Sequence, residues 1–133
     1  MVIPNSVETI GESAFENCTG FEGSLTIGEN VKNIENNAFK GCVGLKGDLV
    51  IPDNVKSIGM FAFENCSGLK EIYLGKNYYG SSKENAESGL YSYGLFDNAF
   101  SLSKIIVSDY NEHFANDENG VLYSKNQAVF YQQ

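Results

Sequence analysis

The sequence contains no arginine, no tryptophan and a single histidine among its 133 residues. Nine lysines stand against seventeen acidic residues, so the formal net charge is −8. A surface that binds nucleic acid or an anionic membrane needs clustered positive charge, because these ligands carry phosphates. The charge balance therefore predicts that nucleic acid is not a partner.

Long apolar runs are also absent. No stretch approaches the roughly 18–20 apolar residues that a membrane-spanning helix needs, so we expect no membrane insertion by this segment. The first residues, Met1-Val2-Ile3-Pro4, lack the basic and apolar regions of a signal peptide. Since they read as the end of a repeat that lacks its leading half, we expect an uncapped first rung that favours end-to-end self-association.

Motifs for metal binding or catalysis are scarce as well. The three cysteines, Cys18, Cys42 and Cys66, are 24 residues apart, whereas a structural zinc site uses pairs separated by two to four residues. His113 belongs to no nucleophile motif, and no acid/base pair or cofactor-binding loop emerges. We therefore predict no catalytic residue, no metal, no cofactor and no enzymatic activity.

What the sequence does contain is a repeat of 24 residues. Three copies share the pattern Ile-Pro-(Asn/Asp)-x-Val-x-x-Ile-Gly followed by Ala-Phe-x-x-Cys-x-Gly-Leu, with a few substitutions. This period lies within the 20–29 residues of leucine-rich repeats and is too short for paired helices. Inward-facing residue types at a constant spacing predict two core ladders. The ladder residues are Phe15, Phe39 and Phe63, with Cys18, Cys42 and Cys66 as buried free thiols.

Each unit predicts one short strand, and the strands stack about 4.8 Å apart in a parallel sheet. A second apolar row of Val and Ile returns along the other side, and the Ala-Phe-x-x-Cys segment is expected to form a helical or 3₁₀ turn. Gly20, Gly44 and Gly68 are expected to supply tight turns with positive φ. The sequence thus predicts an α/β leucine-rich-repeat solenoid, a right-handed superhelix with the sheet on one side and short helical turns on the other. The expected strands are 25–27, 49–51, 72–74 and 105–107.

The fourth unit is altered, and we align Phe100 with Phe63 because each follows an alanine. This alignment requires fourteen extra residues, which we place in a loop insertion at 77–94. Residues 1–107 then form a solenoid of about four units. Two apolar segments, 120–123 and 128–131, flank a polar turn and predict a β-hairpin. Residues 108–133 are therefore expected to cap the last strand.

The repeat motif resembles the BspA-like leucine-rich repeats of bacterial surface proteins over residues 2–107, and Gly120-Val121-Leu122-Tyr123 is similar to a terminal motif of that family. The resemblance implies a secreted or surface-anchored adhesin-like module, located outside the cell or at its surface. It implies binding to host or microbial proteins or glycans and transfers no catalytic residue. The competing function is a structural spacer that displays another domain and has no ligand of its own.

One candidate ligand site is the outward row of the sheet, where we single out Val50, Tyr73 and Ile106. A sheet with one bare face exposes an apolar stripe, and exposed apolar patches often mark contacts. The alternative is that these residues merely reflect the preferences of a strand.

A second candidate site is the tyrosines in the insertion, Tyr78, Tyr79, Tyr91 and Tyr93. Tyrosine among Ser, Gly and Asn is the composition of adaptable binding loops, because its ring gives a large contact area at low entropic cost. The alternative is that these rings fold back and seal the side of the altered fourth unit.

Overall fold

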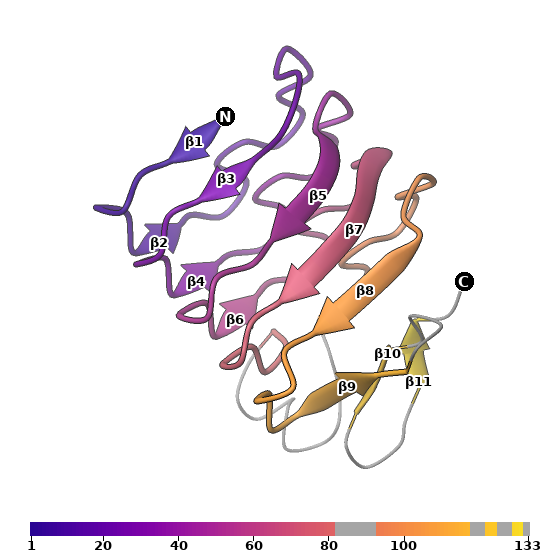
Figure 1. Cartoon of the computed structure of the whole chain (residues 1–133). Coiled ribbons are helices and arrows are strands. Elements are labelled where there is room, and N and C mark those ends of the chain that lie inside the picture. Colours follow the sequence, from indigo (N-terminus) through magenta and orange to yellow (C-terminus); the bar gives the residue numbers. More distant parts are fainter. Residues whose placement is uncertain (82–92, 118–121, 125–128, 132–133) are drawn as a thin grey trace.

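The computed structural model describes residues 1–81, 93–117, 122–124 and 129–131, in which the chain winds into stacked rungs (Figure 1). Each rung adds one strand to a sheet along one side and returns along the other. The described strands are β1 (Val2–Ile3), β2 (Thr9–Ile10), β3 (Thr26–Ile27), β4 (Asn33–Ile34), β5 (Lys46–Val50), β6 (Ser57–Ile58), β7 (Gly68–Leu74), β8 (Lys104–Val107), β9 (Phe114–Asn116), β10 (Leu122–Ser124) and β11 (Val129–Tyr131).

The larger side of the solenoid is formed by parallel strands in the predicted order. β1 pairs with β3, and β5, β7 and β8 form a three-stranded sheet. In the latter sheet Leu49, Ile72 and Ile105 are directly opposite one another, and all three are fully buried. This inward ladder follows from the alternation of a strand, which sends every second side chain to the same face.

The returning side of each rung carries a second parallel sheet, β2-β4-β6, with two residues per strand. Ile10, Ile34 and Ile58 align across it and are buried. The sequence predicts this row as apolar but not as strands, because two residues give no measurable alternation. The hydrophobic core therefore lies between two parallel sheets that are both seen in Figure 1.

The expected helical or 3₁₀ segments are absent from the described part of the chain, where successive turns take their place. The amide of Phe15 donates to the carbonyl of Ala38 in the next rung (2.8 Å), while the amide of Cys18 donates back to Phe15 (3.1 Å). Alternate amides are thus used between rungs, so a continuous helical ladder cannot form. The path also bends through left-handed residues such as Asn17 and Asn65, a conformation that Asn tolerates.

The repeated glycines serve a purpose other than the predicted one. Gly20, Gly44 and Gly68 are not among the residues with positive φ. A Cβ on Gly44 would instead collide with the carbonyl oxygen of Phe21, one rung earlier, and a Cβ on Gly68 with that of Leu45. Glycine is needed here because the backbones of adjacent rungs approach closely.

The fourth rung corrects the predicted alignment. Phe96, not Phe100, continues the ring stack from Phe63, with ring centroids 5.9 Å apart, and Phe100 is 83% exposed. From Leu74 to Phe96 is 22 residues, against 12 from Ile51 to Phe63, so the insertion has ten residues rather than fourteen.

The insertion is also narrower than the predicted range of 77–94. The amide of Ile58 bonds to the carbonyl of Gly80, and that of Phe61 to Tyr93, so both flanks remain in the stack. The extra residues therefore lie between Gly80 and Tyr93.

After β8 the chain forms a small antiparallel sheet in the order β11-β10-β9. β10 and β11 lie in the region where the sequence predicts a hairpin and pair antiparallel, but the residues of the expected turn lie outside the described part of the chain, and β9 is not predicted. Phe114, the first residue of β9, is buried and stacks on Tyr78 at 5.4 Å. The side chain of Asn116 also accepts a hydrogen bond from the amide of Val107 (2.7 Å). These contacts join the segment to the fourth rung.

Candidate binding surface

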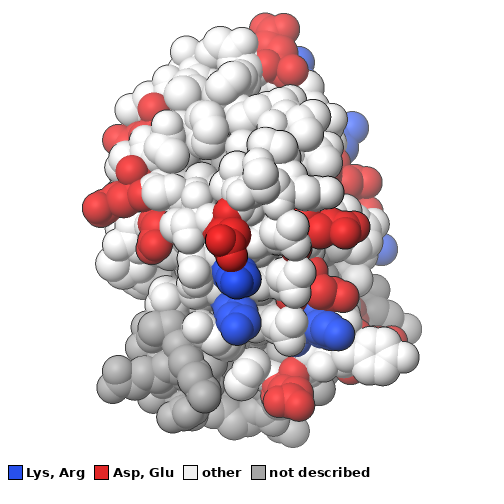
Figure 2. All heavy atoms as spheres, turned by 90° about the vertical axis from the view of Figure 1, so that its left-hand side faces the viewer, with Lys and Arg blue, Asp and Glu red and all other residues white. Residues whose placement is uncertain are grey.

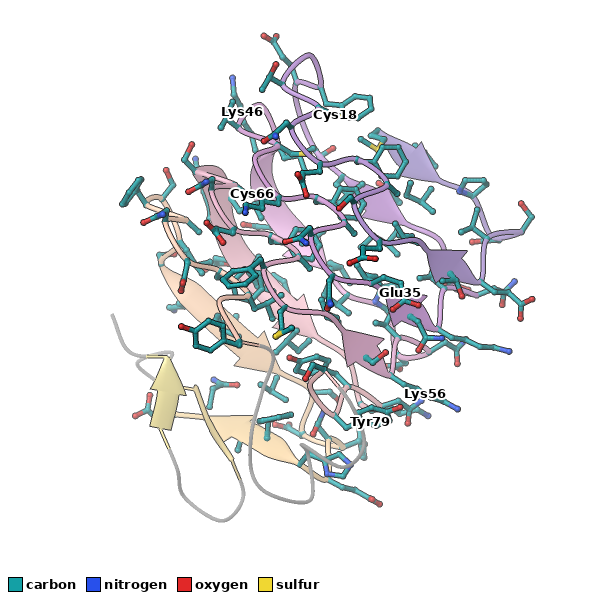
Figure 3. The ribbon with its side chains drawn as sticks, turned by 180° about the vertical axis from the view of Figure 1, so that it is seen from behind. Cys18, Glu35, Lys46, Lys56, Cys66 and Tyr79 are labelled. Atoms are coloured by element: carbon teal, nitrogen blue, oxygen red, sulfur yellow. The ribbon has the colours of Figure 1, made fainter. Side chains whose placement is uncertain are left out.

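The two predicted ladders lie inside the molecule, seen from behind in Figure 3. Phe15 and Phe39, and likewise Phe39 and Phe63, are stacked with centroids 5.2 Å apart. Offset stacking of this kind stabilises aromatic pairs beyond their buried area. Phe39 and Phe63 are fully buried, so the ladder supports the fold and offers no ligand-binding surface.

The three cysteines are free thiols. The thiol of Cys42 donates to the carbonyl of Phe15 (3.0 Å) and that of Cys66 to the carbonyl of Phe39 (3.2 Å). Burial raises the pKa of Cys42 and raises that of Cys66 to about 12. Buried thiols that stay protonated are poor nucleophiles, so these side chains act as small core residues.

The outward row of the sheet forms a shallow groove, which we name the sheet groove. One part, of about 650 Å³, is lined by residues of β3 and β5, including Thr26 and Val50. A second part, of about 370 Å³, shares Val50 and is also lined by Tyr73 and Ile106. Val50 is 58% exposed, while Tyr73 and Ile106 are half-buried. The structure thus brings all three predicted sheet residues into one groove.

Carboxylates surround this apolar row. Glu29, Asp48, Asp53 and Asp109 line the sheet groove, and no lysine is among its described lining residues. The hydroxyl of Tyr73 donates to Glu71 (2.9 Å). This hydrogen bond raises the pKa of Tyr73, because ionisation would place two negative charges side by side. The sheet groove therefore combines apolar contact area with negative potential.

The predicted tyrosines of the insertion do not form one cluster. Tyr78 is fully buried at the repeat position of Val55, so it cannot contact a ligand. Tyr79 is half-buried, with its ring edge-on to His113 at 6.3 Å. Tyr93 is 69% exposed and packs edge-on against Phe61. Tyr91 lies outside the described residues.

A second groove, which we name the lysine groove, lies at the other end of the solenoid from the first rung and has a volume of about 490 Å³. Figure 3 shows Lys56 and Tyr79 side by side there. Sequence reasoning missed this site because its residues come from three separate rung segments. Its lining residues are Lys56, Lys76, Asn77, Tyr79, Tyr110, Glu112 and His113.

No group of three His, Cys, Asp or Glu side chains within the described part of the chain is placed to hold a metal ion. The same residues include no helix that is long and apolar enough to cross a membrane.

Comparison with known proteins agrees with this geometry. A family model described as BspA type leucine rich repeat region matches residues 1–118 in six copies. No curated protein matches the chain.

Three solved structures share the fold, each at 22% identity. The pneumococcal vaccine antigen PcpA has a TM-score of 0.59, with 93% of this chain and 34% of that one covered. A leucine-rich repeat protein from Eubacterium ventriosum has a TM-score of 0.58, covering 94% and 36%. A leucine rich cell surface protein from Faecalibacterium prausnitzii has a TM-score of 0.50, covering 96% and 43%. The chain therefore spans well under half the length of these neighbours.

Proposed function

Because the chain belongs to the BspA-type leucine-rich repeat family, we propose that it is a non-catalytic binding module whose partner is a protein docking in the sheet groove. The observation that carries this proposal is the exposure of Val50, a large apolar side chain that is 58% exposed in the middle of the sheet. Apolar side chains that line a hollow and have a polar rim are typical of contact surfaces.

The charge of the groove specifies the chemistry of the partner. With four carboxylates around the apolar row, the sheet groove attracts a protein surface that presents lysine or arginine beside apolar side chains. Electrostatic complementarity of this kind increases the association rate and weakens as salt is added. The binding is therefore expected to be salt-sensitive.

We place this activity outside the cell or on its surface. The support is the family and the printed description of one neighbour with the same fold as a cell surface protein. On this proposal the partner is a host or microbial protein that is present outside the cell.

A binding screen against immobilised extracellular-matrix proteins and glycans tests the proposal. We expect at least one protein to be bound, and the substitution Val50→Lys to weaken that binding by about tenfold or more, since central residues dominate interfaces. Val43→Lys is the matched control, because Val43 is a similarly exposed valine (47%) outside the sheet groove.

Equal binding by Val50→Lys, Val43→Lys and the unaltered protein would show that the sheet groove is not the interface. Failure to bind any protein would favour a structural spacer that displays another domain.

A further inference from the structure

The lysine groove differs from the rest of the molecule in charge. The protein carries a net charge of −8, yet Lys56 and Lys76 line one hollow together with His113. On the face shown in Figure 2, acidic side chains are scattered, and some basic ones lie together below its centre while others lie along the right-hand edge. The ion pair found among the described residues joins Lys32 to Glu8 (3.0 Å), and neither Lys56 nor Lys76 is paired with a described carboxylate.

Aromatic rings lie beside these cations. Tyr110 is 83% exposed, and Tyr79 is half-buried with its ring against His113. An exposed ring offers an apolar face and a polar hydroxyl at low conformational cost, and such rings are enriched in binding sites. The amide of Asn77 and the carboxylate of Glu112 add groups that can pair with hydroxyls.

The groove is held in shape by one buried residue. Asn111 is fully buried, and its amide donates to the carbonyls of Gly75 and Tyr78, both at 2.9 Å. Its side-chain oxygen accepts from the amides of His113 (2.8 Å) and Phe114 (2.9 Å). These bonds fasten the segment of Tyr110 and His113 onto the rung that carries Lys76 and Tyr79. The lysine groove is therefore preorganised for ligand binding.

From this arrangement we propose that the lysine groove binds an anionic saccharide, that is, a sugar ring carrying a sulfate ester or a carboxylate. Lys56 and Lys76 pair with the anionic group, and the ring packs on Tyr110. Glu112 disfavours a ligand with charge along its whole length, such as nucleic acid, but accepts hydrogen bonds from sugar hydroxyls. The volume of about 490 Å³ lies within the range of small-molecule sites.

The test is a titration of the isotopically labelled full chain, followed by amide chemical shifts. Galactose 6-sulfate and glucuronic acid are the anionic sugars, and galactose and inorganic sulfate are the reference ligands. We expect the two anionic sugars to shift the amides of Lys76, Tyr79 and His113. Each reference ligand should bind more weakly than galactose 6-sulfate, because each lacks one of its two recognition elements.

Matched variants locate the binding. Lys56→Ala and Lys76→Ala should each raise the Kd for galactose 6-sulfate by about three- to fivefold, as expected for an exposed ion pair. Lys32→Ala is the control, because Lys32 occupies the same repeat position one rung earlier and lies outside the lysine groove. It should leave the Kd unchanged, as should Val50→Lys in the sheet groove.

Three outcomes would overturn the inference. One is the absence of shifts with both anionic sugars. Another is equal binding of inorganic sulfate, which would reduce the site to an ion site. The third is an equal loss of affinity in Lys32→Ala and Lys56→Ala, which would indicate a general effect of charge. None of these bears on the sheet groove, whose test is protein binding and whose lining residues are different.

Discussion

The environment of Cys66 makes its thiol unreactive. Its thiol is fully buried and bonded to a carbonyl of the preceding rung, and burial raises its pKa to about 12. At pH 8 only about one molecule in ten thousand would carry the thiolate at this site. We expect iodoacetamide to modify Cys18, which is partly exposed, well before Cys66 in the folded protein. Mass spectrometry of timed samples measures this order.

The same pKa predicts how stability depends on pH. The folded-state pKa of Cys66 lies above the roughly 8.5 of an unfolded cysteine, so the folded state holds this proton more tightly. The resulting stability is complete below about pH 8.5 and is lost as the pH rises toward 12. In a Cys66→Ala variant the free energy of unfolding should therefore decline less steeply over this interval. Parallel declines would contradict the assignment.

Asn111 is a buried polar residue on which several backbone groups depend. Asn111→Ala removes the hydrogen bonds from this side chain to the carbonyls of Gly75 and Tyr78 and to the amides of His113 and Phe114. We expect a loss of about 2–4 kcal/mol in the free energy of unfolding, measured in urea.

The control for Asn111 is Asn54→Ala, which removes one exposed hydrogen bond to Glu29 and should cost less than about 1 kcal/mol. If the two variants lost similar stability, Asn111 would not be the residue that fastens the segment after β8.

At the scale of elements, packing decides which phenylalanine belongs to the fourth rung. Phe96 is 4% exposed and stacks on Phe63, whereas Phe100 is 83% exposed. Phe96→Ala should therefore cost about 3–5 kcal/mol, because it opens a cavity in the core. Phe100→Ala should change stability by less than about 0.5 kcal/mol. Thermal unfolding of the pair measures the difference, and the reverse order would restore the alignment predicted from the sequence.

The turns offer a second matched pair. Gly44 and Gly20 occupy the same repeat position. Of the two, only Gly44 is in close contact with the backbone of another rung, at the carbonyl oxygen of Phe21. Gly44→Ala should cost about 1–3 kcal/mol, because the rungs must move apart. Gly20→Ala meets no atom within 4 Å and should be neutral or slightly stabilising, since it restricts the unfolded chain. Equal effects in denaturant unfolding would argue against the close approach.

We propose that the segment from 108 to the C-terminus caps the solenoid. Phe114 stacks on Tyr78, and the side chain of Asn116 accepts a hydrogen bond from the amide of Val107, so β9 packs against the last rung. Terminal units of this kind protect the open end of a repeat array.

For the whole molecule, the sequence is informative wherever its 24-residue period holds. Constant spacing identifies the strands and the Phe ladder, because identical rungs place identical residues above one another. It fails in the fourth rung, where Ala99-Phe100 imitates the Ala-Phe motif. The distance in sequence to the following strand distinguishes Phe96 from Phe100. Phe96 is nine residues before Ile105, just as Phe63 is nine residues before Ile72.

The two grooves differed in how far they could be predicted. The sheet groove follows from the alternation of single strands, so Val50, Tyr73 and Ile106 could be named in advance. The lysine groove joins Lys56, Lys76 and the segment after β8 across distances that no local pattern records. The one sequence pattern that points to this groove is the recurrence of lysine at the same repeat position, Lys32 and Lys56. This pattern does not predict that Tyr79 and Tyr110 lie beside Lys56.

The stacked rungs also determine how the molecule responds to pulling. β1 and β9 lie toward opposite ends of the stack (Figure 1), so tension between them acts along the hydrogen bonds that join successive rungs. Hydrogen bonds pulled along their own direction break one rung at a time. They need a lower force than hydrogen bonds that are loaded simultaneously by shear. Each released rung of 24 residues adds about 80 Å of extended chain. Stretching by optical tweezers should therefore show low-force steps of about this length, and the protein would act as an extensible tether.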